Sequence, residues 1–182
     1  MSTTTLVTVQ DFLQLPEPKS GHYELHHGEV VLMAPPKWGH EKLQERIREI
    51  FKRTIDDRGT VRMEMAFQPA PEYEVWRADV GVVRKGRADR TPDDEYLQGA
   101  PDLVVEVLSP GNTVDEINDK MTVCLENGCA SFWVVDGKRK EISVTEGDVT
   151  RHYKETSAIT SALLGGTIHL HDIFEPQQSR DR

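Results

Sequence analysis

The sequence predicts a mixed α/β domain in which helices flank a central β-sheet, and two observations carry the prediction. Residues 103–108 are apolar on both faces apart from Glu106, which is typical of a central strand covered on both sides. Residues 40–57 carry apolar side chains at helical spacing, so we expect this helix to pack on the sheet. A chain of 182 residues without repeats or long linkers suits a single domain over 1–182, with a polar tail from about residue 175.

The other elements follow from local signals. Residues 23–33 read as a β-hairpin, because two strand-like runs flank a His27–Gly28 turn. Thr113 and Glu116 form a capping-box pattern at the start of a second long helix. We therefore expect a short helix at 8–14, strands at 61–69, 76–83 and 131–135, a helix at 113–127, a hairpin at 141–154, and a polar loop at 84–99.

The composition argues against several classes of protein. A formal net charge of −9 argues against a protein that coats nucleic acid through bulk electrostatics. No apolar run approaches the roughly 20 residues of a membrane-spanning helix, and the first residues lack the pattern of a secretion signal. Cys124 and Cys129 offer neither a zinc pattern nor a disulfide framework, so we expect a reducing cytoplasm. Basic residues gather in two clusters, and a solvated face is the simplest interpretation of both: Lys42, Arg46, Arg48, Lys52 and Arg53, then Arg84, Lys85, Arg87 and Arg90.

Asp79, Glu106 and Lys120 are the candidate catalytic residues. Two carboxylates on adjacent strands can hold a divalent metal through hard oxygen ligands, and Asp79 and Glu106 lie on successive long strands. Such a metal lowers the pKa of a bound water and offsets negative charge in the transition state. Lys120, on the helix after Glu106, can orient the nucleophile or stabilise the same developing charge. This combination suits the hydrolysis of a phosphodiester bond.

Each of these residues also has a structural interpretation. A carboxylate buried in a core strand needs a cation or hydrogen-bond donors, so Glu106 can form a structural ion pair with Lys120. Asp79 can instead pair with a neighbouring arginine, and Lys120 can pair with Glu116 one helical turn earlier. Asp102 alternates onto the same strand face as Glu106, which makes it a candidate outer ligand, unless it simply begins the strand.

The run Ala100–Pro110, APDLVVEVLSP, is the most specific of several motifs in this chain. Together these motifs resemble the restriction-endonuclease-like family called Uma-two, a branch of the PD-(D/E)xK nuclease superfamily. Residues 77–80 are similar to the family's Arg-Pro-Asp-Val strand, and His40 matches a histidine at the start of its first long helix. Lys120 and residues 128–136 match a helix lysine, a helix-ending glycine and a final core strand. The resemblance covers nearly the whole chain.

The resemblance implies a restriction-endonuclease-like core and a nuclease that depends on Mg²⁺ or Mn²⁺. It assigns Asp79 and Glu106 as metal ligands, with Lys120 as the third catalytic residue. The superfamily's lysine lies two residues after the second acid, where this chain has Leu108, so Lys120 would act from the following helix. His40 and Glu29 would line the cleft from the helix and the hairpin. Two departures, Ala78 for proline and Cys124 for tyrosine, remove none of these groups.

Two classes of function fit these expectations. The first is a metal-dependent endonuclease that hydrolyses DNA, with RNA or damaged DNA as other substrates of the same chemistry. The second is a non-catalytic module that keeps the nuclease fold for binding or regulation, and the net charge of −9 lends it support. We also expect a homodimer, because a domain with one site cuts two strands most simply as two copies. We expect no association with a membrane.

Overall fold

A seven-stranded mixed sheet forms the centre of the molecule. The computed structural model describes residues 5–175. Its strands run in the order β5-β3-β4-β6-β7-β8-β9, with β3–β5 and β6–β7 parallel and all other neighbours antiparallel. The strands are β3 (Gly59–Gln68), β4 (Trp76–Arg84), β5 (Leu97–Gln98), β6 (Leu103–Val107), β7 (Ser131–Asp136), β8 (Glu141–Glu146) and β9 (Val149–Lys154). The predicted mixed sheet is confirmed, and β6 is its middle strand, buried at every position.

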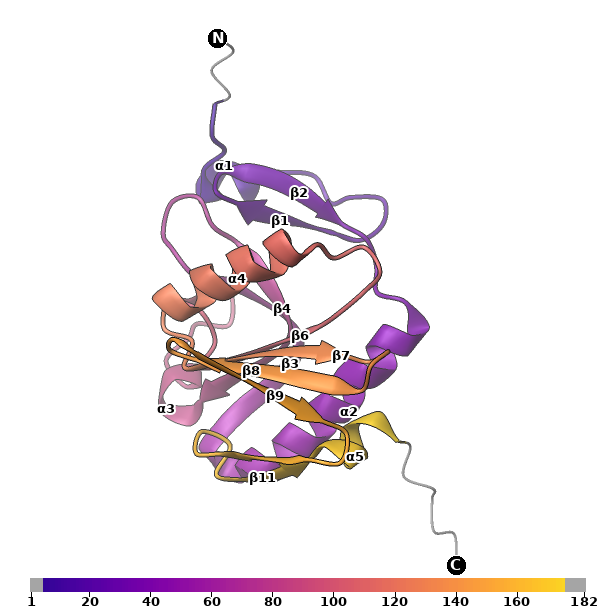
Figure 1. The fold of residues 1–182 in the computed structure, drawn as a ribbon. Helices are drawn as coiled ribbons and strands as arrows, with labels where there is room; N and C mark the ends of the chain where they lie inside the picture. Colours follow the sequence, from indigo (N-terminus) through magenta and orange to yellow (C-terminus); the bar gives the residue numbers. More distant parts are fainter. Residues whose placement is uncertain (1–4, 176–182) are drawn as a thin grey trace, which may run out of the picture.

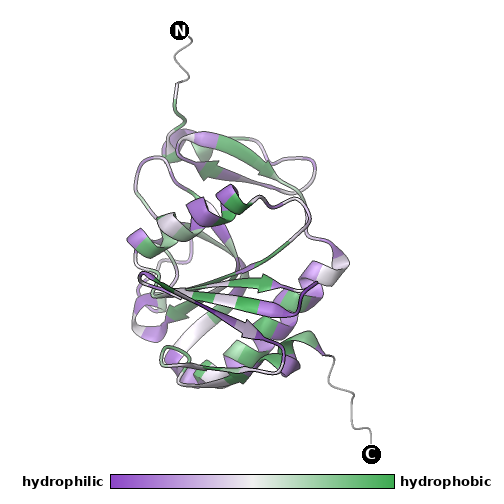
Figure 2. Ribbon diagram, in the orientation of Figure 1, coloured by the Kyte–Doolittle hydropathy of each residue, from purple (hydrophilic) through white to green (hydrophobic). Residues whose placement is uncertain are grey.

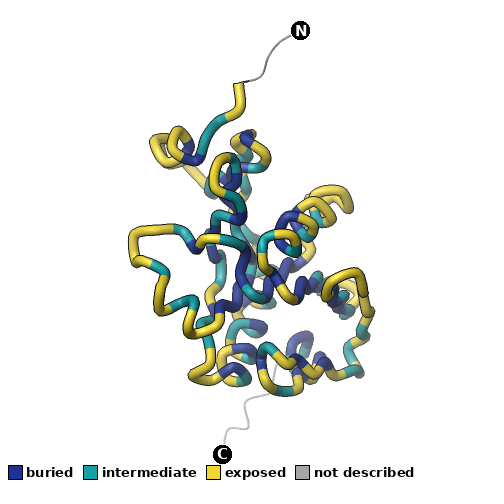
Figure 3. Tube along the Cα trace, turned by 90° about the vertical axis from the view of Figure 1, so that its left-hand side faces the viewer, coloured by how far each residue is buried: buried dark blue, intermediate teal, exposed yellow. Residues whose placement is uncertain are grey.

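Two long helices cover opposite faces of the sheet, as Figure 1 shows. On one face, α2 (Trp38–Ile55) packs Ile47 and Phe51 against apolar residues of β6 such as Val105. On the other face, α4 (Val114–Glu126) packs Cys124 against Val104 of β6 and Phe132 of β7. The strands between the helices are largely hydrophobic, and the outer sides of the helices are hydrophilic (Figure 2). Burial is likewise concentrated in the middle of the molecule (Figure 3).

The N-terminal hairpin packs beside β4 at one end of the sheet. Strands β1 (His22–His26) and β2 (Glu29–Met33) pair in antiparallel fashion, and the intervening His27 and Gly28 both have positive φ, as a two-residue type I′ turn requires. Leu25 forms a bridge with Val75 just before β4, and its buried side chain packs with α1 (Val9–Phe12). The hairpin is therefore attached to the strand that carries Asp79.

The crossover between β6 and β7 is set by local sequence signals. Thr113 caps α4: its hydroxyl accepts from the main-chain N of Glu116, whose carboxylate accepts from the Thr113 N–H in turn. The helix stops before Gly128, whose φ of 103° is readily adopted only by glycine. Both predicted signals are confirmed, and together they define where α4 begins and ends.

The sequence-based assignment was wrong in two regions. The segment expected to be a polar loop contains α3 (Lys85–Ala88) and β5, and each is too short to show a periodicity. No element was predicted after residue 154, yet β10 (Ala158–Ser161), β11 (Gly166–His169) and α5 (Leu170–Phe174) lie there. They bury apolar residues such as Ile159 and Ile168 against α2, beyond the short 3₁₀ turn η1 (Asp56–Arg58). The tail predicted beyond residue 175 lies outside the described residues.

Candidate active site

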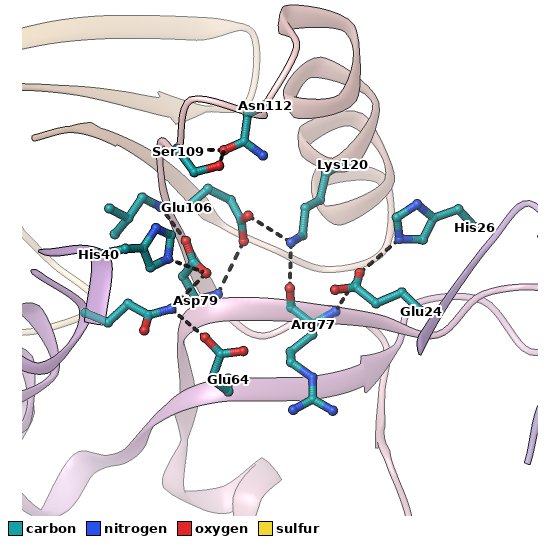
Figure 4. A network of polar contacts seen from close by, with 12 residues as sticks. Glu24, His26, His40, Glu64, Arg77, Asp79, Glu106, Ser109, Asn112 and Lys120 are labelled. Carbon is teal, nitrogen blue, oxygen red and sulfur yellow. Dashed lines mark hydrogen bonds and ion pairs between the residues drawn. The ribbon is translucent and has the colours of Figure 1, made fainter. Parts of the chain in front are cut away.

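Asp79 and Glu106 face each other on neighbouring strands. Val80 of β4 pairs with Val105 of β6, so the antiparallel register places Asp79 across from Glu106. The main-chain N–H of Asp79 donates to Glu106 Oε1 at 3.4 Å, and the N–H of Val107 donates to Asp79 Oδ2 at 2.6 Å. Each predicted carboxylate thus accepts from a main-chain N–H of the neighbouring strand (Figure 4).

Lys120 reaches this pair from α4. Its Nζ lies 2.8 Å from Glu106 Oε2 and donates to the main-chain carbonyl of Arg77 at 2.5 Å. Lys120 and Glu106 are both buried, with 8% and 7% of their surfaces exposed. The structure therefore brings together the three candidate catalytic residues predicted from the sequence: Asp79 from β4, Glu106 from β6 and Lys120 from α4. The suggested pair of Lys120 with Glu116 is wrong, because the Glu116 carboxylate is used in the helix cap.

His40 and Gln44 contact Asp79 from the first turns of α2. His40 Nε2 lies 3.1 Å from Asp79 Oδ1, and Gln44 Nε2 donates to the same oxygen at 2.9 Å. His40 is thus placed beside the candidate catalytic residues, where the sequence expected it. Sequence reasoning missed Gln44, although its position four residues after His40 on the same helix face was a usable signal.

Gln44 connects Asp79 to another carboxylate, that of Glu64 on β3. The same Nε2 donates to Glu64 Oε1 at 2.5 Å, and Gln44 is fully buried. Glu64 has a φ of +48°, a conformation that costs energy for a residue with a side chain and that clusters at functional sites. The Gln44 Oε1 atom is buried without a hydrogen-bond partner in the described chain. The Gln44 amide oxygen is therefore an unused hydrogen-bond acceptor on the residue that holds Asp79.

Glu24 of β1 lies on the other side of Lys120, and sequence reasoning missed it as well. His22 Nε2 and His26 Nε2 lie 3.0 and 2.9 Å from its two oxygens, and the N–H of Arg77 donates to Oε2 at 3.3 Å. Figure 4 shows Glu24 and Lys120 meeting the same stretch of β4 at Arg77. The only sequence signal was a carboxylate within a strand whose neighbour Leu25 is apolar.

Burial and the neighbouring charges shift the pKa values of Glu106, Lys120 and Glu24. Burial, with smaller contributions from Asp79 and Glu24, raises the pKa of Glu106 to about 8 against the opposing effect of Lys120. Burial alone would lower the pKa of Lys120, but Glu106, Glu24 and Asp79 raise it above its ordinary value. Burial alone would raise the pKa of Glu24, yet Lys120 and the two histidines lower it. One ammonium group therefore serves three carboxylates.

Glu29 and Asp102 lie apart from this cluster. Asp102 accepts from the N–H of Arg84 at 3.0 Å and lies 3.8 Å from Arg87, at the start of β6. Four residues of extended strand separate it from Glu106, or about 13 Å. The described structure gives Asp102 contacts with Arg84 and Arg87 at the strand start and none with Asp79 or Glu106, so it does not support the interpretation of Asp102 as an outer ligand. Glu29 is exposed on β2, and the described structure gives it no hydrogen bond or ion pair with the three candidate residues. The hairpin presents Glu24 to Lys120 instead.

The donor set suits a hard divalent cation. Asp79 and Glu106 supply carboxylate oxygens, the ligands that hard divalent cations prefer. Gln44, whose Nε2 binds Asp79, has in addition a buried amide oxygen without a partner. Within residues 5–175, no group of three or more His, Cys, Asp or Glu side chains is arranged to hold a metal. The chemistry of the donors therefore fits Mg²⁺ or Mn²⁺ with two carboxylates, and water would complete the coordination, as Mg²⁺ commonly requires.

Two arginines of the basic clusters serve the fold. The Arg46 guanidinium donates to the carbonyls of Ile173 and Phe174, and that of Arg87 donates to the carbonyls of Ala100 and Gln98. Lys42 lies 5.3 Å from the centre of the exposed Trp38 ring.

Both cysteines are free and buried. No helix in the described part of the chain combines the length and the apolar character needed to cross a membrane.

The fold and the architecture of the sheet define a restriction-endonuclease-like protein. The chain belongs to the Uma2 (Uma-two) family, described as "Putative restriction endonuclease", whose model matches residues 9–180. Among solved structures it is similar to "a putative nuclease belonging to DUF820 from Anabaena variabilis", with a TM-score of 0.79 and 17% sequence identity over 92% of this chain and 97% of that one. No curated protein matches the sequence. The expected fold and family are confirmed, and the family indicates a nuclease.

Proposed function

We propose that this protein is a Mg²⁺- or Mn²⁺-dependent endonuclease that hydrolyses phosphodiester bonds in DNA. The observation that carries the proposal is the meeting of Asp79, Glu106 and Lys120 from β4, β6 and α4. Asp79 and Glu106 would hold the metal, which supplies a water of lowered pKa and offsets charge on the phosphoryl oxygens. We further propose that it acts in the cytoplasm as a homodimer, since closed pairs are the commonest assembly.

The chain's own residues have distinct roles in this proposal. Lys120 is fixed between Glu106 and the Arg77 carbonyl, so its ammonium group needs little reorganisation to stabilise developing negative charge. His40 and Gln44 hold the Asp79 carboxylate in one orientation through Oδ1. Preorganised donors of this kind contribute more to catalysis than donors that must first move into position.

A non-catalytic nuclease-fold module is the second candidate function. Both carboxylates already accept hydrogen bonds from the chain itself, which partly satisfies them without a metal. The net charge of −9 also opposes general electrostatic binding to nucleic acid, which a nuclease would use. In this second function the buried pair of Glu106 and Lys120 would be purely structural.

Calorimetric titration with Mn²⁺ separates the two functions. We expect binding by the wild type that is lost in Glu106→Gln and in Asp79→Asn. Glu72→Gln is the matched control, because Glu72 is exposed on a loop and loses the same charge. Cleavage of plasmid DNA in Mg²⁺ or Mn²⁺ should likewise occur with the wild type and with Glu72→Gln, and should be lost in Glu106→Gln and in Asp79→Asn. Absence of metal binding by the folded wild type would leave the second function, and binding that survives both substitutions would place the metal elsewhere.

A further inference from the structure

Arg77 lies on β4 between Glu24 on one side and the Asp79–Glu106 pair on the other. We propose that its guanidinium binds a backbone phosphate of the substrate, next to the phosphodiester bond that is cleaved at Asp79 and Glu106. This inference rests on the proposed function and adds the direction in which the nucleic acid leaves the site, along β4 on the side away from Lys120.

The main chain of Arg77 is held from both sides. Its N–H donates to Glu24 Oε2 at 3.3 Å, and its carbonyl accepts from Lys120 Nζ at 2.5 Å. On its other edge, Arg77 pairs with Ala66 of β3. A side chain that starts from so constrained a backbone loses little further freedom when it binds a ligand.

The Arg77 side chain makes no hydrogen bond or ion pair within residues 5–175, and its Nε is buried without a partner. Other arginines in the described chain that lack such a partner, Arg53, Arg62 and Arg90, are exposed to water, whereas Arg77 is half-buried. A buried polar group without a partner is costly, so each case in a native structure requires an explanation. A ligand of this chain would supply the missing acceptor.

The carboxylates that border Arg77 are bound by other groups. Glu24 accepts from two histidines and from the Arg77 main chain, and Glu64 accepts from Gln44. Figure 4 shows the Arg77 carbonyl directed at Lys120 and its guanidinium directed away from Lys120. In a chain with 31 acidic residues, this arginine has no acidic partner in the described structure. An anion from outside the chain is the natural complement.

Phosphate is the anion that matches both the residue and its location. The planar guanidinium fork binds phosphate oxygens with two parallel hydrogen bonds, which a lysine cannot reproduce. Arg77 lies two residues before Asp79, about 7 Å along the strand. A phosphodiester chain positioned for cleavage at Asp79 therefore passes within reach of Arg77 with its next phosphate.

The test measures how binding of a short fluorescein-labelled DNA duplex depends on salt, by fluorescence anisotropy. All proteins carry Glu106→Gln so that the duplex stays intact. Arg77→Met removes the charge but keeps the apolar stem, Arg77→Lys keeps the charge, and Arg90→Met removes a charge from an exposed loop arginine. Thermal unfolding of each variant establishes that it is folded.

We expect Arg77→Met to weaken binding and to reduce the slope of log K against log[salt] by about one, as for the loss of one phosphate contact. Arg77→Lys should keep the slope but bind more weakly, and Arg90→Met should match its parent. An unchanged slope in Arg77→Met, or an equal change in Arg90→Met, would overturn the assignment of Arg77 while leaving DNA binding intact. No binding by any of the proteins, together with no cleavage by the wild type, would overturn the proposed function itself.

Discussion

Glu24 and Asp79 are two carboxylates on opposite sides of Lys120, and they differ in what surrounds them. Each accepts from three donors: His22, His26 and a main-chain N–H for Glu24, and His40, Gln44 and a main-chain N–H for Asp79. Glu24 is closed off, with 4% of its side chain exposed, whereas 17% of the Asp79 side chain is exposed. The two carboxylates therefore differ in their exposure and not in their number of donors.

The surroundings of Asp79 retain unused capacity. Gln44 has an unpartnered oxygen there, and Glu64 is held with a positive φ. Beside Glu24 the Arg77 Nε is also buried without a partner, but the Glu24 carboxylate itself is almost completely covered, which leaves a ligand no access to it. Strain and unsatisfied polar atoms persist where function selects for them, so we infer that the Glu24 cluster stabilises the fold and the Asp79 cluster binds a ligand. This comparison leads to experiments on both clusters.

The largest effect on stability is expected from Lys120→Met, which removes the cation shared by both clusters. Removal of one partner from a buried ion pair typically costs about 3–5 kcal/mol. The charge left without compensation at neutral pH is that of Glu24, whose pKa Lys120 lowers, whereas Glu106 can take up a proton. Urea unfolding at neutral pH should report this loss. Lys85→Met, which removes an exposed lysine from α3, should change the free energy of unfolding by less than about 0.5 kcal/mol. Equal effects of the two substitutions would contradict the central role of Lys120.

A smaller loss of stability is expected from Glu24→Gln. The substitution weakens hydrogen bonds to a charged acceptor, which contribute about 1.5–3 kcal/mol each, so we expect a loss of about 2 kcal/mol. Mn²⁺ binding should remain, in contrast to Asp79→Asn. Loss of metal binding in Glu24→Gln without unfolding would end the distinction between the two clusters.

The same variant has a defined pH dependence. The pKa of Glu24 is lowered by folding, so its contribution to stability is fully present above its ordinary value of 4.5 and is lost as the pH falls below that value. Acid titration of stability should therefore show a steeper loss below pH 4.5 in the wild type than in Glu24→Gln.

The sequence predicted the elements whose signals are local and strong. The capping box at Thr113, the glycine at 128 and the apolar β6 all have direct physical causes in neighbouring residues. The strands β10 and β11 have four residues each, and so short an alternation does not distinguish a strand from a loop. Their burial depends on tertiary contacts with α2, which no local pattern reveals.

The site was predicted as far as charge and family resemblance allow. Asp79, Glu106 and Lys120 meet as expected, because alternation and strand order bring them together. Gln44 is neutral and sits within a helix, so it did not stand out beside His40. Glu64 has no detectable signal, since neither its positive φ nor its hydrogen bond with Gln44 of α2 is indicated by its neighbours in sequence.

Glu106 is expected to have a pH dependence opposite to that of Glu24. Burial raises its pKa in the folded state from 4.5 to about 8. The folded, metal-free protein therefore binds this proton more tightly than the unfolded chain does. Its contribution to stability is therefore present below pH 4.5 and is progressively lost as the pH rises towards 8. Glu106→Gln, which cannot ionise, should lose less stability over this range when unfolding is followed in EDTA. Parallel pH profiles of the two proteins would mean that Lys120 keeps Glu106 ionised throughout.

The smallest effect is expected at His27, which connects the hairpin turn to Glu74, just before β4, and to Asp119 of α4. Its Nδ1 lies 2.8 Å from Glu74 and its Nε2 lies 3.0 Å from Asp119, the residue before Lys120. The hydrogen bond to Asp119 and the charges of both acids raise the pKa of His27 despite partial burial. Its contribution is therefore fully present below pH 6.5 and is lost as the pH rises through the higher folded value.

His27→Asn tests this contact without disturbing the turn, because asparagine tolerates the positive φ of 51°. About half of the His27 side chain is exposed, so water screens the ion pairs and we expect a loss of only about 0.5 kcal/mol below pH 6.5. The difference from the wild type should shrink at alkaline pH and at high salt, whereas His152→Asn on exposed β9 should show neither trend. A difference that is constant with pH would mean that the hairpin is held by neutral contacts such as Leu25 with Val75, and that the imidazole charge plays no part in its attachment to Glu74 and to Asp119 of α4.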